Sequence, residues 1–131
     1  MIPYSRQNIS EDDIEAVIKV LKSEFLTNGP IVNQFEIACS HNFKVKYCTS
    51  MNSATSALHV ACLSLGLKKN DIVWTTPNTF VASANCALYC GAKIDFVDIN
   101  SETNLIDIQL LSKKLDKAEK ANKLPKIIIP V

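Results

Sequence analysis

Glycine and arginine are both scarce in this sequence. The 131 residues include 3 glycines, and neither the GxGxxG nor the GxxxxGK[ST] pattern occurs. Dinucleotide-binding folds and P-loop proteins use such glycines for the close approach of backbone to phosphate, so neither kind of nucleotide binding is expected. A single arginine stands among 14 basic residues, and the formal net charge is +1. Because nucleic-acid readout prefers arginine and a strongly basic surface, no nucleic-acid partner is expected.

Signals for membranes, disulfides and metals are lacking as well. No stretch approaches the ~18 apolar residues of a membrane span, and the N-terminal MIPYSRQNISEDD has no signal-peptide pattern. We therefore expect a cytoplasmic protein without a membrane partner. The 5 cysteines are odd in number and form no CxxC pair, so neither a disulfide framework nor a metal site is encoded. Cys48, Cys62, Cys86 and Cys90 fall within apolar patterns and are interpreted as small buried side chains.

The sequence does contain a regular alternation of helical and strand patterns. Ser10 followed by Asp13 resembles a capping box, and the apolar spacing after it predicts the first helix. Strands that are almost continuously apolar, alternating with helices, are typical of an α/β fold with a mostly parallel open sheet and flanking helices. The predicted helices cover residues 11–22, 34–43, 53–65, 79–90 and 106–122, and the predicted strands cover 46–50, 71–76, 92–99 and 126–131.

The last segment, IIIPV, has the composition of a buried strand, and it ends at Val131 with no turn, cap or polar tail after it. Domains seldom stop inside a core strand, so we expect this chain to be the N-terminal piece of a longer protein. Ligands of open parallel sheets gather at the carboxyl ends of the strands. Some site residues are therefore expected after Val131.

The segment NSATSAL, residues 52–58, places small and hydroxyl-bearing residues at a strand-to-helix junction. Ser, Thr and Asn at such a position commonly cap the first N–H groups of the helix. Those N–H groups and the Ser53 and Thr55 hydroxyls could instead bind a phosphate at the positive end of the helix. The residues alone favour capping but leave both interpretations open.

A second strand-to-helix junction, TTPNTFVASAN, brings Phe80 to the start of a helix near the same edge of the sheet. An aromatic ring there could stack on a flat ligand. A Phe at helical spacing is more often core, and the pattern by itself favours the core. The two histidines, His41 and His59, lie on predicted helices among ordinary neighbours and are interpreted as structural.

Taken together, four segments resemble the DegT/DnrJ/StrS family of pyridoxal phosphate (PLP)-dependent sugar aminotransferases. They are PYS, FLTNGP, NSATSALHVACLSLGLKKND and WTTPNTFVASANCALYCGAKIDFVDI, and the similarity keeps their order from about Ile2 to Val131. Within the family the chain looks most similar to transaminases of pseudaminic acid biosynthesis. The resemblance implies the large domain of a fold-type I aminotransferase. It also implies a division into residues 1–30, an N-terminal helix and substrate loop, and residues 31–131, an incomplete PLP-binding domain.

The resemblance also implies roles for individual residues. The turn at Ser53, Ala54 and Thr55 would hold the phosphate of PLP, with Ala54 also close to the substrate, and Phe80 would lie over the pyridine ring. The substrate is implied to be a UDP-sugar. In this family such pockets form at the interface of a homodimer. The residues implied to line the nucleotide-sugar pocket are Tyr4, Glu24, Phe25, Leu26 and Thr27, together with Ala54.

The family's catalytic groups are not found in these residues. Its lysine that binds the cofactor covalently, its aspartate that pairs with the pyridine nitrogen and a histidine-bearing segment are expected after Val131, so no catalytic residue is assigned here. Asp98 and Lys93 are interpreted as solvated charges. Without that lysine the chain alone is expected to be inactive in transamination.

Three interpretations of function remain open. The first is the N-terminal part of an enzyme that transfers an amino group, from glutamate, to C4 of a 4-keto-6-deoxy UDP-sugar. The second is a non-catalytic module that binds sugar nucleotides, or a dehydratase-like relative without the lysine. The third is a truncated chain that associates with copies of itself through its exposed half-sheet.

Overall fold

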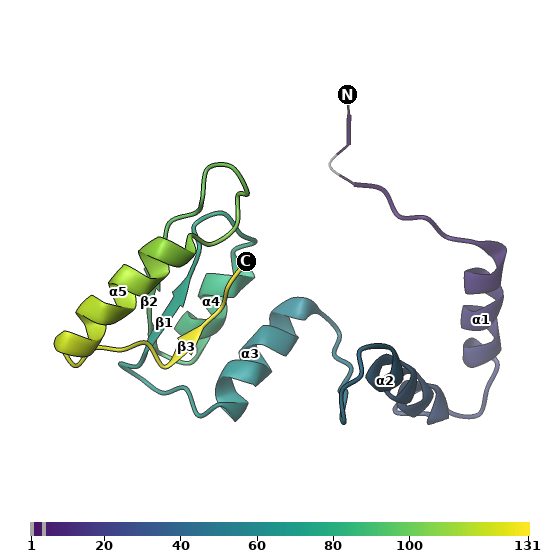
Figure 1. The fold of residues 1–131 in the computed structure, drawn as a ribbon. Coiled ribbons are helices and arrows are strands. Elements are labelled where there is room, and N and C mark those ends of the chain that lie inside the picture. Colours follow the sequence, from purple (N-terminus) through teal and green to yellow (C-terminus); the bar gives the residue numbers. More distant parts are fainter. Residues whose placement is uncertain (1, 4) are drawn as a thin grey trace. The chain divides into compact units, whose positions relative to one another are not determined.

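The computed structural model describes residues 2–3 and 5–131 (Figure 1). The chain forms two compact units, Met1–Ser50 and Met51–Val131. Both consist of helices joined by short connections, but strands occur in the second unit only within the described residues. No helix in the described part of the chain is both long and apolar enough to cross a membrane.

Helix α1 (Glu11–Leu21) begins where its capping signal predicts. The Ser10 N–H donates to the Asp13 carboxylate (2.8 Å), and the Asp13 N–H donates to Ser10 Oγ (3.3 Å). The bond from the Ser10 N–H, and next a bond from the Ser10 hydroxyl to the same carboxylate (2.8 Å), hold the pKa of Asp13 below its ordinary value. The predicted helix over residues 11–22 and its capping box are confirmed.

Helix α2 (Pro30–Asn42) begins earlier than the pattern over residues 34–43 predicts. Pro30 occupies the first helical position, where its fixed φ suits the helix and its missing N–H costs nothing. Gly29 precedes it in a tight approach, since a Cβ there would lie 2.7 Å from the Phe25 carbonyl oxygen. The connection between α1 and α2 therefore ends at Gly29, sooner than the pattern predicts.

The strand predicted over residues 46–50 is wrong. The segment forms no ladder with another strand among the described residues. At its end, the Ser50 N–H donates to the carboxylate of Glu36 on α2 (2.7 Å). A strand is defined by its pairing, so an apolar, extended sequence without a neighbouring strand remains an irregular segment.

The second unit is an α/β unit built on a parallel sheet with the order β2–β1–β3, which confirms the predicted fold class (Figure 1). In the register, Val73 lies opposite Ile94 on one side and Ile127 on the other. Parallel neighbours require crossover connections, and helices supply them here. The strands are β1 (Ile72–Thr75), β2 (Lys93–Phe96) and β3 (Ile127–Ile128), and the helices are α3 (Ala54–Ser64), α4 (Ala82–Tyr89) and α5 (Ile108–Lys120).

Two apolar clusters lie on opposite faces of β1, because successive side chains of a strand point in opposite directions. Val73 packs with Cys62 of α3 and Cys86 of α4. Trp74 packs with Val97 and, on α5, Ala118. Helices α3 and α4 therefore cover one face of the sheet and α5 covers the other (Figure 1).

An ion pair and a cation–π contact fasten α5 to its face of the sheet. The Lys114 Nζ lies 2.7 Å from the Asp95 carboxylate, 2.6 Å from the Phe96 carbonyl oxygen and 4.7 Å from the centre of the Trp74 ring. The hydrogen bond from Lys114 is the main cause of the lowered pKa of Asp95. The predicted amphipathic helix over residues 106–122 is confirmed, with shorter ends.

Glycines follow the ends of α3 and α4, close to the ends predicted at residues 65 and 90. Gly66 and Gly91 both have left-handed φ values, +69° and +72°, which a glycine adopts without strain.

Strand β3 is shorter than predicted. Pro130 has no N–H to donate, and the Val131 carbonyl oxygen accepts from the Ile106 N–H (3.0 Å) outside the sheet.

The cysteines are buried to different degrees. Cys62 and Cys86 are buried as predicted, whereas Cys48 and Cys90 are only half-buried. Burial and the neighbouring thiol of Cys86 raise the pKa of Cys62 to about 12. His59 packs edge-on against Tyr89, with ring centres 5.3 Å apart, which agrees with its structural interpretation.

Candidate cofactor site

The topology brings two helix starts to one edge of the sheet. Helix α4 follows β1 directly, so it begins at the carboxyl end of that strand. Helix α3 leads into the amino end of β1 and packs against α4, so its own N-terminus lies toward the carboxyl edge. This is the edge at which parallel sheets collect their ligands. The NSATSAL segment and Phe80 therefore belong to the same part of the second unit.

The start of α3 combines a helix cap with N–H groups that could bind a phosphate, the two interpretations that its sequence left open. Ser53 is the N-cap, and its Oγ accepts a hydrogen bond from the Ser56 N–H (3.1 Å). Capping is therefore confirmed for Ser53. For the N–H groups of Ala54 and Thr55, the described part of the chain supplies no hydrogen-bond acceptor. These two donors point out of the helix start, where an anion would meet the positive end of the helix dipole.

Phe80 is 74% exposed, so the preference for a core position drawn from its helical spacing is wrong. The helix begins later than predicted, at Ala82, and the chain enters it through a turn over residues 80–83, in which the Ser83 N–H donates to the Phe80 carbonyl oxygen (3.0 Å). A hydrogen bond between the Thr79 and Ser83 hydroxyls (3.0 Å) fixes this turn. The ring is thus presented outside the helix on an ordered turn, while its stacking role stays a prediction.

Sequence reasoning missed two threonines at the end of β1. The Thr75 Oγ1 donates to the Ile129 carbonyl oxygen (2.9 Å) and joins β1 to the segment after β3. Thr76 is fully buried, and its Oγ1 has no hydrogen-bond partner among the described residues. A buried hydroxyl left unpaired costs about 1–3 kcal/mol. The pair TT directly before a turn was the available signal, because polar residues at a strand's carboxyl end are candidates for ligand or interface contacts.

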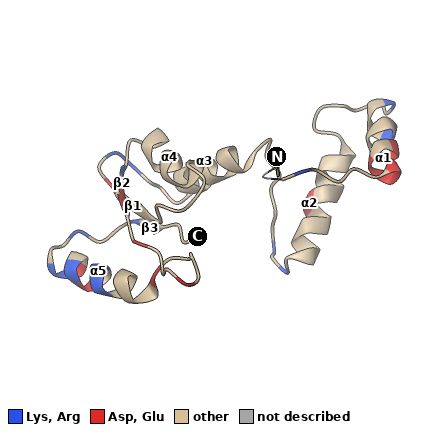
Figure 2. Ribbon diagram, turned by 90° about the horizontal axis from the view of Figure 1, so that it is seen from above, with Lys and Arg blue, Asp and Glu red and all other residues tan. Residues whose placement is uncertain are grey.

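The site has no ionised side chain of its own on the two helices that form it. Neither α3 nor α4 contains Lys, Arg, Asp or Glu, and both are uniformly tan in Figure 2. Any attraction for an anion at this edge must therefore come from backbone N–H groups and the helix dipole. Free N–H groups and the positive end of a helix dipole both suit a phosphate that is held by hydrogen bonds. The residues present therefore fit the phosphate of PLP.

The charged side chains nearest to consider, those of Asp98, Lys93 and Lys114, are either solvated or bonded to other groups. Asp98 is exposed, and its carboxylate accepts from the Ile99 N–H (2.8 Å). Lys93 is exposed at the amino end of β2. Lys114 is occupied by Asp95 and the Phe96 carbonyl on the α5 face. Asp98 and Lys93 are therefore solvated charges, as predicted. Among the described residues, no cluster of His, Cys, Asp or Glu side chains could hold a metal ion.

The predicted substrate residues belong to the first unit. Tyr4 lies outside the described residues. Glu24, Phe25, Leu26 and Thr27 connect α1 to α2, and Phe25 and Leu26 are each 62% exposed. Phe25 also borders a mostly apolar groove of about 310 Å³. The other residues lining that groove are Ala16, Lys19, Val20, Ser23, Pro30 and Ile31.

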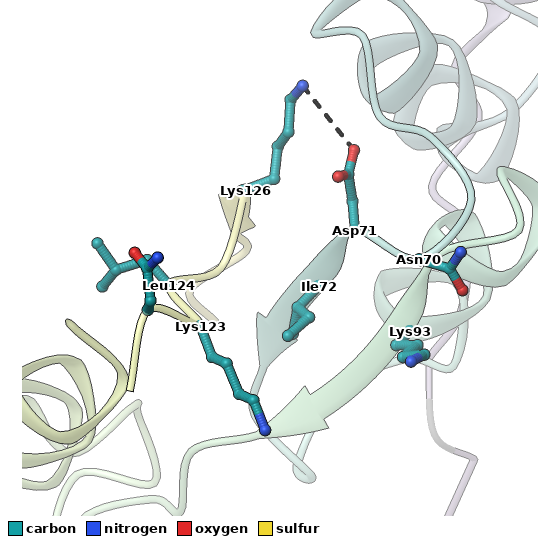
Figure 3. A pocket seen from close by; sticks show the side chains of 8 residues that line it. Asn70, Asp71, Ile72, Lys93, Lys123, Leu124 and Lys126 are labelled. Carbon is teal, nitrogen blue, oxygen red and sulfur yellow. Dashed lines mark ion pairs between the residues drawn. The ribbon is translucent and has the colours of Figure 1, made fainter. Parts of the chain in front are cut away.

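A larger groove, of about 710 Å³, lies at the opposite edge of the sheet (Figure 3). Most of its lining residues are polar or charged, and Lys126 on its wall lies 3.8 Å from the Asp71 carboxylate. It adjoins the amino ends of the strands, away from the start of α3, so we do not assign the cofactor to it despite its size. Its lining residues are Asn70, Asp71, Ile72, Lys93, Asn122, Lys123, Leu124 and Lys126.

These features define a class of protein. An α/β unit with a parallel sheet, a helix N-terminus suited to phosphate and an exposed aromatic ring at the carboxyl edge matches the large domain of fold-type I aminotransferases. The chain belongs to the DegT/DnrJ/EryC1/StrS aminotransferase family, whose model matches residues 7–131. The resemblance seen in the sequence is therefore confirmed.

Individual relatives support the same family. The chain is 50% identical over 117 residues to the UDP-4-amino-4,6-dideoxy-N-acetyl-β-L-altrosamine transaminase of Campylobacter jejuni, covering 89% of this chain and 31% of that protein. Helicobacter pylori PseC, an aminotransferase involved in the biosynthesis of pseudoaminic acid, is 32% identical with a TM-score of 0.82, over 98% of this chain and 33% of its own. The PLP-form of the sugar aminotransferase Spr1654 from Streptococcus pneumoniae is 31% identical with a TM-score of 0.80, over 86% and 29%.

The present chain thus spans about a third of the length of the relatives it matches. The family and the fold of these residues are shown by the match.

Proposed function

We propose that this chain is the N-terminal part of a PLP-dependent nucleotide-sugar aminotransferase. The enzyme transfers an amino group, from glutamate, to C4 of a 4-keto-6-deoxy UDP-sugar in the biosynthesis of surface glycans such as pseudaminic acid. The observation that carries the proposal is that two N–H groups at the start of α3, which have no acceptor in the described part of the chain, and the exposed ring of Phe80 belong to the same edge of the sheet. The identity to altrosamine transaminases supports the choice of substrate.

The residues of this chain bind and orient the cofactor. The Ala54 and Thr55 N–H groups hold its phosphate, and Ser53 keeps them in place by capping the helix. Phe80 covers the pyridine ring and keeps water from that face. When bound, PLP supplies an electron sink for the charge that develops during transfer of the amino group. The lysine that binds it covalently, and moves the proton, belongs to residues after Val131.

The substrate loop is the second contribution of this chain. Glu24, Phe25, Leu26 and Thr27, with Tyr4 and Ala54, line the pocket for the UDP-sugar. The exposure of Phe25 and Leu26 supports a role in contacting another molecule. We place the pocket at the interface of a cytoplasmic homodimer. Residues 1–30 then act as the substrate-binding part, and residues 31–131 as the incomplete cofactor-binding domain.

Borohydride reduction in the presence of PLP, followed by intact mass measurement, tests the proposal. The 131-residue chain should acquire no single-site adduct. The complete protein should acquire one, on a lysine after Val131, and should aminate a 4-keto-6-deoxy UDP-sugar with glutamate as donor. A stoichiometric adduct within residues 1–131 would contradict the assignment of roles. Binding of the UDP-sugar by a complete protein without any adduct would instead favour a binding module or a dehydratase-like relative.

A further inference from the structure

The turn that carries Phe80 is held at two points by one residue, Ser83. The Ser83 N–H donates to the Phe80 carbonyl oxygen (3.0 Å), and a hydrogen bond joins the Ser83 and Thr79 hydroxyls (3.0 Å). Thr79 directly precedes Phe80 in the chain. The two bonds therefore hold the chain on both sides of the Phe80 Cα atom, and all three residues belong to the second unit.

Ser83 is itself fixed by the core of this unit. It is 7% exposed, and Cys86, one helical turn further along α4, is fully buried. The Cys86 thiol donates to the Ser83 carbonyl oxygen (3.4 Å) and packs in the same apolar cluster as Val73 of β1. The start of α4 is thus anchored to the sheet, and the two bonds of Ser83 extend that order to the half-buried Thr79 and to Phe80.

The direction of an aromatic ring depends on the backbone that bears it. The rotamers open to a side chain are set by the φ and ψ angles at its own Cα atom. Stacking on a flat ligand requires the two rings to meet face to face with a lateral offset, so a change in those angles moves the ring away from its ligand. A bond that fixes the turn at Phe80 therefore bears on how well this ring can stack.

We propose that Thr79 and Ser83 are positioning residues for the Phe80 ring, which they orient through the hydrogen bond between their hydroxyls. The inference rests on the proposed function, because it concerns the ring that covers the pyridine of PLP. In this role neither hydroxyl contacts the cofactor. Their bond orders the turn before the cofactor arrives, so less conformational freedom is lost on binding and the affinity is higher.

The test is the affinity of the complete protein for PLP, measured by absorbance titration, with the visible circular dichroism of the bound cofactor as a spectroscopic readout. Thr79→Val keeps the branched shape without the hydroxyl and should weaken binding about fivefold, an effect of about 1 kcal/mol. Thr79→Ser keeps the hydroxyl and should bind nearly as tightly as the wild type. Ser83→Ala should match Thr79→Val, and the double variant should lose no more than either, because all three lack the same bond.

A second comparison tests whether the bond acts through the ring. In a Phe80→Ala background, Thr79→Val should cause no further loss of PLP affinity, since no ring is left to orient. Its effect on the circular dichroism of the bound cofactor should disappear as well. The same fivefold loss with and without the ring would show that Thr79 acts on the fold in general, and would overturn the inference.

Two matched controls separate positioning from the loss of a hydroxyl or of stability alone. Ser64→Ala removes a hydroxyl that bonds to the Ala61 carbonyl oxygen (2.9 Å) at the last residue of α3. Leu67→Val removes a methylene group from the buried cluster and should lower the urea midpoint. Both should leave the PLP affinity and the circular dichroism unchanged. Should Thr79→Val fail to fold, Ser83→Ala decides the question in the same two backgrounds.

The outcomes distinguish this inference from the proposed function. Weakened binding in Thr79→Val and Ser83→Ala that vanishes in the Phe80→Ala background supports the positioning role. Unchanged affinity in both variants, with weakened binding in Phe80→Ala, overturns it and leaves the aminotransferase assignment intact. Unchanged affinity in Phe80→Ala itself overturns the stacking role of the ring and this inference with it. A wild-type complete protein that does not bind PLP overturns the proposed function as well.

Discussion

The two units of this chain differ most in what their helices bury. In the second unit, α3, α4 and α5 each contribute buried residues to the clusters on the two faces of β1. In the first unit, neither α1 nor α2 has a buried residue, although α1 is clearly amphipathic. Ile14 and Val17, on its apolar face, are 43% and 58% exposed. Caps and spacing are thus sufficient to define a helix locally, whereas burial requires a partner surface.

This contrast also separates the two proposed roles. The cofactor residues of the second unit stand on a packed sheet-and-helix framework, which can hold N–H groups in fixed directions. The substrate residues of the first unit lie on a connection between two helices with exposed apolar faces. A preorganised phosphate site and an adaptable sugar loop fit these different settings. Four substitutions test this contrast between the two units.

The largest effect is expected from Trp74→Ala. Trp74 is 3% exposed and packs with Val97 and Ala118, so its removal should lower the free energy of unfolding by about 3–5 kcal/mol. Val17→Ala, on the exposed face of α1, should change it by less than about 0.5 kcal/mol. Urea unfolding of the 131-residue chain, followed by circular dichroism, measures both. Equal effects would mean that the face of α1 is buried in solution, against the contrast drawn here.

A smaller but more specific effect is expected from Ala54→Pro. Proline is accepted at the first helical position but carries no N–H, and the extended backbone of Ser53 suits a following proline. The complete protein should lose PLP affinity by about tenfold or more, because a hydrogen bond to a charged group contributes about 1.5–3 kcal/mol. Absorbance titration with PLP measures the change, and circular dichroism checks that the helix persists.

The control introduces a proline at the first position of a helix that has no proposed phosphate site. Glu11→Pro replaces the first helical residue of α1, where no phosphate is proposed. It should leave the affinity for PLP unchanged. An equal loss of PLP affinity in both variants, or no loss in Ala54→Pro, would show that the Ala54 N–H does not bind the phosphate.

The cap of α1 should matter locally because that helix has no buried face to hold it. Ser10→Ala removes the acceptor for the Asp13 N–H and should destabilise the helix start by about 1 kcal/mol. Amide hydrogen exchange in the first turn of α1 should accelerate, while exchange in α5 stays constant. Unchanged protection in that first turn would show that tertiary contacts, rather than the cap, hold α1.

The smallest effect concerns the ion pair on α5. The hydrogen bond from Lys114 holds the pKa of Asp95 below 3.8, so this carboxylate stabilises the fold above that pH, and its contribution is lost as pH falls through the lowered pKa. Lys114→Met should return the pKa of Asp95 toward 3.8 and reduce stability at neutral pH by less than about 1 kcal/mol, since Asp95 is 54% exposed. Carbon-13 NMR titration measures this pKa. Lys120→Met is the matched control, and an equal shift there would assign the effect to net charge instead.

Much of the fold could be predicted because its signals are local. The Ser10–Asp13 box, the caps at Ser53 and the glycines after α3 and α4 depend on residues within a few positions, so the sequence identified those helix ends. The sheet strand predicted over residues 71–76 was found at Ile72–Thr75. The candidate site was recognised only partly, since the roles of Ser53, Ala54, Thr55 and Phe80 came from resemblance to a family. Their positions agree with those roles, which stay predictions.

The α/β class, the helix ends marked by caps and glycines, and the family could all be recognised in the amino-acid sequence. Three further features became visible in the folded chain: residues 46–50 form no strand, Phe80 is exposed, and the Glu36 carboxylate accepts from Ser50. The physical reason is the range of the interactions. A helix cap is formed by residues a few positions apart in the sequence. Strand pairing, the exposure of a side chain and a hydrogen bond between residues 14 positions apart depend instead on which distant segments the fold brings together.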